Sequence, residues 1–185
     1  MGKPAVAVLA AGRGTRFGGG KLEVPCAGKP LGRWVIEAVD AAGLGPGTIV
    51  IGPEGVSFAP AWTALLNPQP ERGLGSSLAL AARAALDGEA SALLILLADM
   101  PLVTPDYLRE FADGTVPRAT RQPDGHAGVP AVLDRALLER AAELCGNRGA
   151  GLLLSDTPLL DPPAGMLRDV DTPEDLCEVE RALLL

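Results

Sequence analysis

The sequence predicts an α/β fold in which helices cover both faces of a mainly parallel central sheet, giving a three-layer sandwich. Two short, wholly apolar runs, 5–11 and 92–98, have the pattern of strands that are buried on both faces. Segments with helical periodicity lie between and after these runs. Buried strands that alternate with amphipathic helices are typical of a sheet with helices packed on both sides.

The first half of the chain alternates strand and helix. After the strand at 5–11 and a glycine-rich loop, apolar residues recur at helical spacing over 31–42, and Gly43 closes this helix. A second strand is expected at 48–51, because threonine, valine and isoleucine dominate it. An alanine-rich helix is expected at 78–86.

The apolar run 92–98 is expected to be a central strand. It ends abruptly at Asp99 and Pro101, so the carboxylate of Asp99 should lie at the carboxyl end of the strand. The triplet Thr104-Pro105-Asp106 then supplies an N-cap, a proline at the first helical position and an acid in the first turn. A helix is therefore expected from this point.

Three further segments complete the expected order. Asp134 can cap a helix that carries leucines and alanines on one face. The stretch 168–171 is predicted to be a short strand with its exit loop, and Thr172-Pro173-Glu174-Asp175 to begin the last helix. Neither an internal repeat nor a linker is evident, so we expect a single domain over residues 1–185.

Composition excludes several classes of protein. A net charge of -7 disfavours a nucleic-acid partner, which normally needs clustered basic residues. No apolar run approaches the ~18 residues of a spanning helix, so no membrane partner is expected. The three cysteines show no C-x-x-C spacing, which indicates reduced thiols and a cytoplasmic protein.

The loop 10–21 is the clearest candidate for chemistry. It combines glycines with the cationic residues Arg13, Arg16 and Lys21. Glycines let backbone N–H groups approach phosphate oxygens, and the cations neutralise charge on a polyphosphate. Two other phosphate motifs do not fit, because Lys21 is not followed by Ser or Thr and Phe17 stands where a dinucleotide fingerprint needs glycine. The loop therefore predicts a nucleoside triphosphate site.

Each candidate site residue also has a purely structural explanation. The loop could be a solvated turn, and Asp99 a turn former before a proline. Asp171 could serve only in helix capping, and Ser76 and Ser77 could cap the alanine-rich helix. His126, the only histidine, is expected on the surface.

Five blocks of residues follow one another along nearly the whole chain, and together they resemble the MobA-like nucleotidyltransferases, in particular the molybdenum cofactor cytidylyltransferases (MocA-like). The resemblance implies a Rossmann-like sandwich of the nucleotidyltransferase type. The blocks are L-A-A-G-R-G-T-R-F-G at 9–18 with Lys21 and G-K-P-L at 28–31, N-P at 67–68 with G-L-G-S-S-L at 73–78, L-A-D-M-P-L-V at 97–103, G-V-P at 128–130, and D-V-D-T-P-E-D-L at 169–176.

The resemblance implies roles for particular residues. Asp99 would bind Mg²⁺, with Asp171 or Asp169 as a weaker candidate for a second carboxylate. Lys21 and Arg16 would act with Asp99 in catalysis. Further residues are expected to hold the nucleotide. Those at the triphosphate are Gly12, Arg13, Gly14, Arg16 and Lys21, and the pair Ala10 and Ala11 belongs to the same motif. Those near the base and ribose are Gly75, Ser76 and Ser77.

The reaction implied is the transfer of a cytidylyl group from CTP to molybdopterin cofactor. In the family, Ala-Ala in the first motif goes with cytidine nucleotides, so Ala10-Ala11 favours CTP. Mg²⁺ needs only one or two protein carboxylates beside substrate phosphates. An acceptor phosphate would attack the α-phosphate in line and expel pyrophosphate, without a general base. A molybdoenzyme or its chaperone would be the protein partner.

Two alternatives stay open. The same class of enzyme could use GTP or another acceptor, as in guanylyl transfer or sugar-phosphate activation, because 146–151 departs from the family's G-D-x-G-A-R pattern on the acceptor side. A module that binds a nucleotide or cofactor without turnover is the alternative from a different class.

Overall fold

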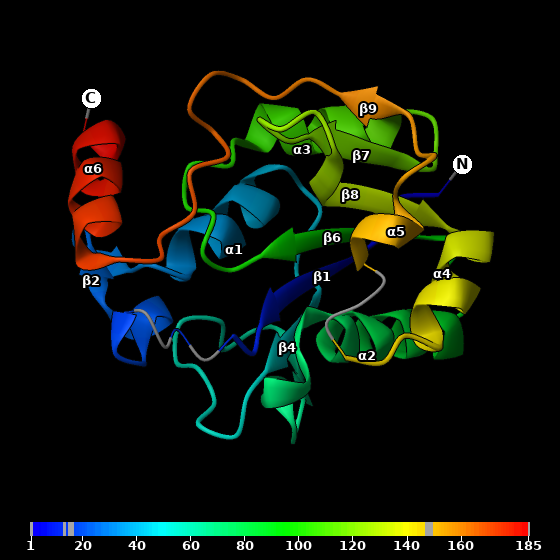
Figure 1. The fold of residues 1–185 in the computed structure, drawn as a ribbon, viewed down its shortest axis with the longest axis horizontal. Helices are drawn as coiled ribbons and strands as arrows, with labels where there is room; N and C mark the ends of the chain where they lie inside the picture. Colours follow the sequence, from blue (N-terminus) through cyan, green and yellow to red (C-terminus); the bar gives the residue numbers. More distant parts are fainter. Residues whose placement is uncertain (1, 13, 15–16, 147–149, 185) are drawn as a thin grey trace.

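A computed structural model describes residues 2–12, 14, 17–146 and 150–184, and it shows a seven-stranded sheet between two layers of helices (Figure 1). The predicted three-layer α/β architecture is confirmed. In sheet order, the strands are β5 (Thr63–Leu66), β4 (Thr48–Ile51), β1 (Ala5–Ala10), β6 (Ala92–Leu97), β8 (Ala127–Asp134), β7 (Arg118–Arg121) and β9 (Leu159–Leu160). The helices are α1 (Arg33–Ala41), α2 (Leu74–Asp87), α3 (Pro105–Asp113), α4 (Arg135–Ala142), α5 (Ala150–Leu153) and α6 (Pro173–Leu183).

The sheet is parallel except at one strand. β5, β4, β1 and β6 pair in parallel, whereas β8 runs antiparallel to both of its neighbours. β8 was not expected, because Gly128 and Pro130 interrupt its apolar pattern. Pro130 is tolerated because the register between β7 and β8 shifts between Ala119 and Thr120, opposite this part of β8.

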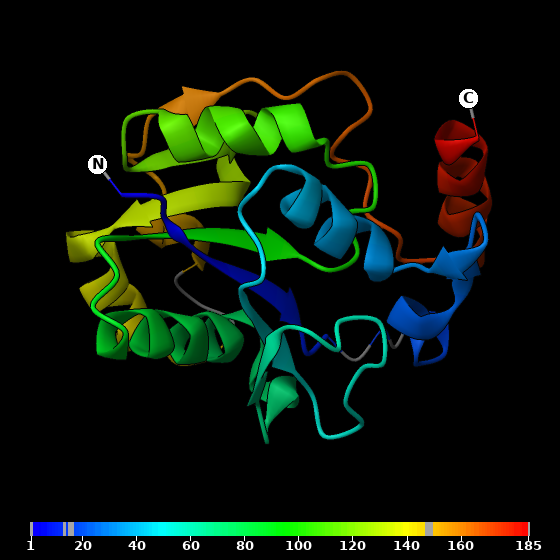
Figure 2. The same ribbon diagram turned by 180° about the vertical axis from the view of Figure 1, so that it is seen from behind.

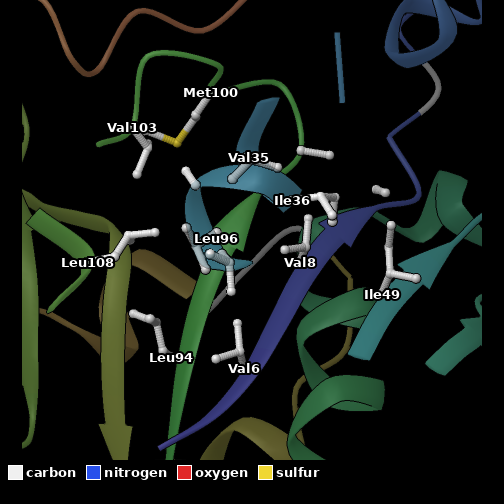
Figure 3. Packing of buried hydrophobic residues seen from close by; sticks show 14 of the residues in the cluster. Val6, Val8, Val35, Ile36, Ile49, Leu94, Leu96, Met100, Val103 and Leu108 are labelled. Carbon is white, nitrogen blue, oxygen red and sulfur yellow. The ribbon is translucent and has the colours of Figure 1, made fainter. Parts of the chain in front are cut away.

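Alternate residues of the central strands pack into two separate cores. Val8 of β1 and Leu94 and Leu96 of β6 lie in the core that holds α1 and α3 (Figure 3). Leu9 of β1 and Ile95 of β6 lie in the core on the other side, with α2, α4 and α5. A strand with apolar side chains on both faces must be covered twice, which explains the unbroken apolar runs.

The predicted helix starts are confirmed where a capping side chain is present. The side chains of Thr104, Asp134 and Thr172 accept hydrogen bonds at the starts of α3, α4 and α6. At α6, Thr172 and Asp175 form a reciprocal capping box. The alanine-rich helix α2 starts at Leu74, four residues before the expected position, since Gly73 provides its N-cap with a φ of 93°.

The strand predicted at 168–171 is wrong. This segment forms no strand, and its backbone contact with the end of β6 is a hydrogen bond of 3.2 Å from Val170 N to Asp99 O. The N–H groups of Asp171 and Thr172 are instead bound by the Asp175 carboxylate at the start of α6. Capping of the helix therefore takes the donors that a strand would need.

The C-terminal helix α6 lies at one side of the molecule, beside a small hairpin. This hairpin is formed by β2 (Pro25–Cys26) and β3 (Lys29–Pro30), and Figure 2 shows α6 standing next to it. The N–H of Ala27 in the hairpin turn donates to Glu180 at 2.7 Å. Across the described residues, no helix is long and apolar enough to cross a membrane.

We expect Leu94→Ala to destabilise the fold by about 3 kcal/mol, because Leu94 is fully buried and its removal leaves a cavity in the central strand. Urea unfolding followed by circular dichroism measures this loss. Leu184→Ala is the control, since Leu184 is 75% exposed, and it should change the free energy of unfolding by less than about 0.5 kcal/mol. Equal effects of the two changes would contradict the assignment of the core.

Candidate active site

Two cavities lie side by side at the carboxyl ends of the parallel strands. This edge of the sheet is where ligands of open α/β proteins bind. The two cavities share Ala10, Ala11, Gly12, Lys21, Leu22 and Pro70. The large cavity, about 1100 Å³, is also lined by Gly18, Gly19, Gly20, Glu23, residues 52–57, Pro68 and Glu71. The small cavity, about 210 Å³, reaches Leu97, Ala98, Asp99, Gly73, Leu74 and Ser77.

Lys21 connects three segments that are far apart in the sequence. It lies in η2 (Lys21–Glu23), a short 3-10 helix after the glycine-rich loop. Its ammonium donates to Asp99 Oδ2 at 2.7 Å, to Val170 O at 2.7 Å and to Asp171 Oδ1 at 3.1 Å. Only 7% of the Lys21 side chain is exposed, so this cation is buried with its hydrogen bonds satisfied.

The charge balance around Lys21 favours the protonated amine. Burial acts to lower the pKa of Lys21, but the charges and hydrogen bonds of Asp99 and Asp171 outweigh it and raise the pKa above its ordinary value. Asp99 is 20% exposed, and its second oxygen, Oδ1, is buried with no hydrogen-bond partner among the described residues. Unsatisfied buried acceptors of this kind are uncommon and mark a place where a ligand can bind.

The acidic residues near Lys21 fit a divalent cation that is completed by a substrate. The pKa of Asp169 is raised because its carboxyl group is partly buried and because the negative charges of Asp99 and Asp171 lie nearby. Among the described residues, no group of three acidic, histidine or cysteine side chains is placed to hold a metal alone. Mg²⁺ takes one or two carboxylates and fills its other positions with water and phosphate oxygens, so Asp99 and Asp171 suit it.

The glycine-rich loop presents little steric obstruction to the cavity. Gly18, Gly19 and Gly20 all have positive φ, and a Cβ on any of them would meet nothing within 4 Å. Gly14 differs, because a Cβ there would approach Lys21 Cγ to 3.2 Å. The predicted phosphate ligands Arg13 and Arg16 lie outside the described residues, as do residues 147–149 of the acceptor-side departure.

The start of α2 is organised by a residue for which the sequence suggested no role. Asn67 is buried, and its side-chain amide donates to Ser76 Oγ at 2.9 Å and to Ser77 Oγ at 3.0 Å. Ser77 lines the small cavity, but Gly75 is buried and lines neither cavity. The hydroxyl of Ser76 donates to Gly73 O at 2.7 Å. The structure therefore gives both serines a structural part in joining α2 to the end of β5.

Residues 52–57 form a wall of the large cavity that was not predicted from the sequence. This segment directly follows β4, the neighbour of β1, and all six of its residues line the cavity. A signal was available, since Gly52-Pro53-Glu54-Gly55 follows a predicted strand at its carboxyl end. Glu23, whose side chain contacts this wall at Ser57, was not predicted to have a role either.

Comparison with known proteins identifies the family. A model of the MobA-like NTP transferase domain matches residues 6–163. The chain belongs to this family. Membership confirms the resemblance drawn from the motifs and makes the chain a member of a nucleotidyltransferase family.

Two curated relatives show how far the similarity of this MobA-like chain extends. It is 38% identical over 120 residues to the bifunctional protein GlmU of Geobacter metallireducens, which covers 61% of the chain and 25% of the relative. The chain thus spans about a quarter of the length of that protein. It is 27% identical over 195 residues to the purine catabolism protein PucB of Bacillus subtilis, covering 95% of each.

Solved structures show the same fold. A nucleotidyl transferase from Methanothermobacter superposes with a TM-score of 0.82 at 22% identity, covering 100% of this chain and 99% of that one. Rv0371c of Mycobacterium tuberculosis, in complex with manganese, gives 0.77 at 21% identity, with 98% and 100% covered. A CMP:2-keto-3-deoxy-manno-octonic acid synthetase complexed with CTP gives 0.75 at 16% identity, with 99% of each covered.

We expect Lys21→Met to destabilise the protein by about 2 kcal/mol, because it leaves the largely buried carboxylate of Asp99 without its cation. The double variant Lys21→Met/Asp99→Asn should lose less than the sum of the two single changes. Chemical unfolding measures all three. Lys3→Met is the control, since Lys3 makes an exposed contact with Gly43 O. If the losses in free energy of unfolding at Lys21 and Asp99 simply add in the double variant, the two residues are not coupled.

The contribution of Lys21 to stability should depend on pH at the alkaline end. Since its pKa is raised above the ordinary 10.5, folding favours the protonated amine. The stabilisation is fully present below pH 10.5 and is lost as the pH rises through the higher value of the folded state. The difference in free energy of unfolding between wild type and Lys21→Met should therefore shrink only above pH 10.5. A difference that disappears well below this pH would show that the pKa is not raised.

Proposed function

We propose that the chain is a Mg²⁺-dependent nucleotidyltransferase that transfers the cytidylyl group of CTP to molybdopterin cofactor and releases pyrophosphate. The observation that carries this proposal is the buried contact of Lys21 with Asp99, at the junction of two cavities on the carboxyl edge of the sheet. A cation and a metal-binding carboxylate at one point suit the phosphates of a nucleotide.

In this proposal the large cavity takes the nucleotide. Ala10, Ala11 and Gly12 line both cavities and lie beside Lys21, so they form the floor on which the nucleotide rests. Lys21 neutralises the phosphates, together with the proposed ligands Arg13 and Arg16. Asp99 and Asp171 hold Mg²⁺, which supplies charge neutralisation to the phosphate oxygens when it is bound.

The chemical step needs alignment more than proton transfer. An oxygen of the acceptor phosphate forms a bond to the α-phosphorus of CTP while the bond from that phosphorus to the bridging oxygen breaks, and pyrophosphate leaves with the electron pair. The acceptor phosphate is already ionised, so the protein needs no general base. Lys21 stabilises the charge that develops on the leaving group, and burial of its side chain fixes its position.

The identity of the nucleotide and the acceptor rests on the sequence motifs. Ala10 and Ala11 favour CTP over GTP by the family pattern. The rival in which a sugar phosphate accepts the nucleotidyl group rests on residues 146–151, which depart from the family pattern on the acceptor side. A molybdoenzyme or its chaperone would receive the product.

Pyrophosphate release tests the proposal directly. With MgCl₂ and molybdopterin cofactor, wild type should release pyrophosphate with CTP and far less with GTP or ATP. Asp99→Ala should lower the rate by about 100-fold or more, because it removes the metal-binding carboxylate. Asp87→Asn is the matched control, since Asp87 is an exposed carboxylate at the end of α2 that lines neither cavity, and it should act like wild type.

The other outcomes separate the alternatives. Release with GTP would assign guanylyl transfer, and release only when a sugar phosphate replaces the cofactor would assign sugar-phosphate activation. Tight binding of CTP by calorimetry, without release for any acceptor, would indicate a binding module. Equal activity of Asp99→Ala and wild type would overturn the role of Asp99.

A further inference from the structure

One carboxylate ties the two rims of the large cavity together. Glu23 in η2 accepts a hydrogen bond from Ser57 N at 2.6 Å through Oε1 and another from Ser57 Oγ at 2.7 Å through Oε2. Both carboxylate oxygens thus bind the same residue, 34 positions away. Both residues line the large cavity. We call this pair, Glu23 and Ser57, the rim clasp.

Glu23 is on the firmly held side of the clasp. Leu22, its neighbour in η2, is buried in the core beside α1. Two backbone hydrogen bonds fix the same turn to the chain that leads into α1, from Leu31 N to Val24 O and from Gly32 N to Leu22 O, each 2.9 Å. The backbone of Glu23 therefore has a position that does not depend on Ser57.

Ser57 is on the more exposed side of the clasp, although its neighbours Val56 and Phe58 pack against the core that holds α1. It ends the segment 52–57, which we call the loop wall. In the loop wall Pro53, Glu54 and Ser57 are exposed, and Gly55 has a φ of 70°. Among the described residues, the backbone hydrogen bond of the loop wall runs from Gly55 N to Gly52 O, inside the wall itself. Figures 1 and 2 both show the wall beside η2, where the clasp joins them.

We propose that Glu23 is a positioning residue that sets the loop wall for the nucleoside part of the bound nucleotide. This inference rests on the proposed function, in which the large cavity takes the nucleotide. The phosphate end is placed by Lys21 and Asp99, at the junction with the small cavity. Residues 52–57 line only the large cavity, so they contact the part of the ligand that lies away from the phosphates.

The proposal predicts a selective loss of binding. Without the clasp the loop wall samples more conformations, and a ligand that needs the wall must order it on binding. Glu23→Ala should raise the Kd of CTP by about five- to tenfold, the size expected for losing a pair of hydrogen bonds to a carboxylate at an exposed site. The Kd of tripolyphosphate, which lacks base and ribose, should not change.

Three further variants separate the clasp from charge and from general stability. Glu23→Gln keeps an acceptor for Ser57 N and a donor for Ser57 Oγ without the charge, so it should bind CTP nearly as wild type. Ser57→Thr keeps both of the groups that donate to Glu23 and should also bind normally. Ser57→Ala removes only the hydroxyl donor, so it should weaken CTP binding less than Glu23→Ala does, and Glu23→Ala should add a smaller loss in that background than in wild type.

Titration calorimetry with CTP and with tripolyphosphate, both with MgCl₂, measures the Kd of each ligand. Amide hydrogen exchange measures the local stability of the loop wall in the absence of ligand. The Ser57 amide should exchange faster in Glu23→Ala than in wild type, while β1 and β6 are unchanged. Equal loss of CTP and tripolyphosphate binding, or equal loss in Glu23→Ala and Glu23→Gln, would overturn the proposal. If wild type binds no nucleotide, the proposed function fails; unchanged exchange at Ser57 in Glu23→Ala would overturn the clasp alone.

Discussion

The buried ammonium of Lys21 is the contact on which the arrangement of the site depends. It joins the end of the glycine-rich loop, the carboxyl end of β6 at Asp99 and the segment before α6 at Val170 and Asp171. A buried cation is tolerated only where its donors are satisfied, and here one carbonyl and two carboxylates satisfy them. The contact therefore both neutralises the acidic groups and brings three distant segments to one place.

The sheet explains why these segments can meet. β1 and β6 are parallel neighbours, so the glycine-rich loop and Asp99 leave the sheet at the same edge. The two cores hold these strands from both faces and keep their ends in register. The third segment reaches the site without a strand, and the capping box of α6 begins directly after Asp171.

The cavities divide the site into parts with different physical character. Near Lys21 and Asp99 the surroundings are charged and mostly buried, which suits phosphate and metal. The opposite wall, residues 52–57, is partly exposed and contains two glycines, and Glu23 binds Ser57 at its end from the facing rim. Under the proposed function, the charged end of the site faces the polyphosphate and the loop wall faces the nucleoside.

Sequence alone determined the two central strands, the capped starts of α3, α4 and α6, the glycine-rich loop and the place of Asp99 at the end of a strand. These features depend on local patterns of polarity and on turn chemistry. The tertiary structure decided the antiparallel course of β8, the absence of a strand at 168–171, the Asn67 contacts to Ser76 and Ser77, and the clasp between Glu23 and Ser57. Each of these depends on which distant donor or strand lies opposite, and strand pairing and side-chain hydrogen bonds over tens of residues leave no periodic signal in the chain.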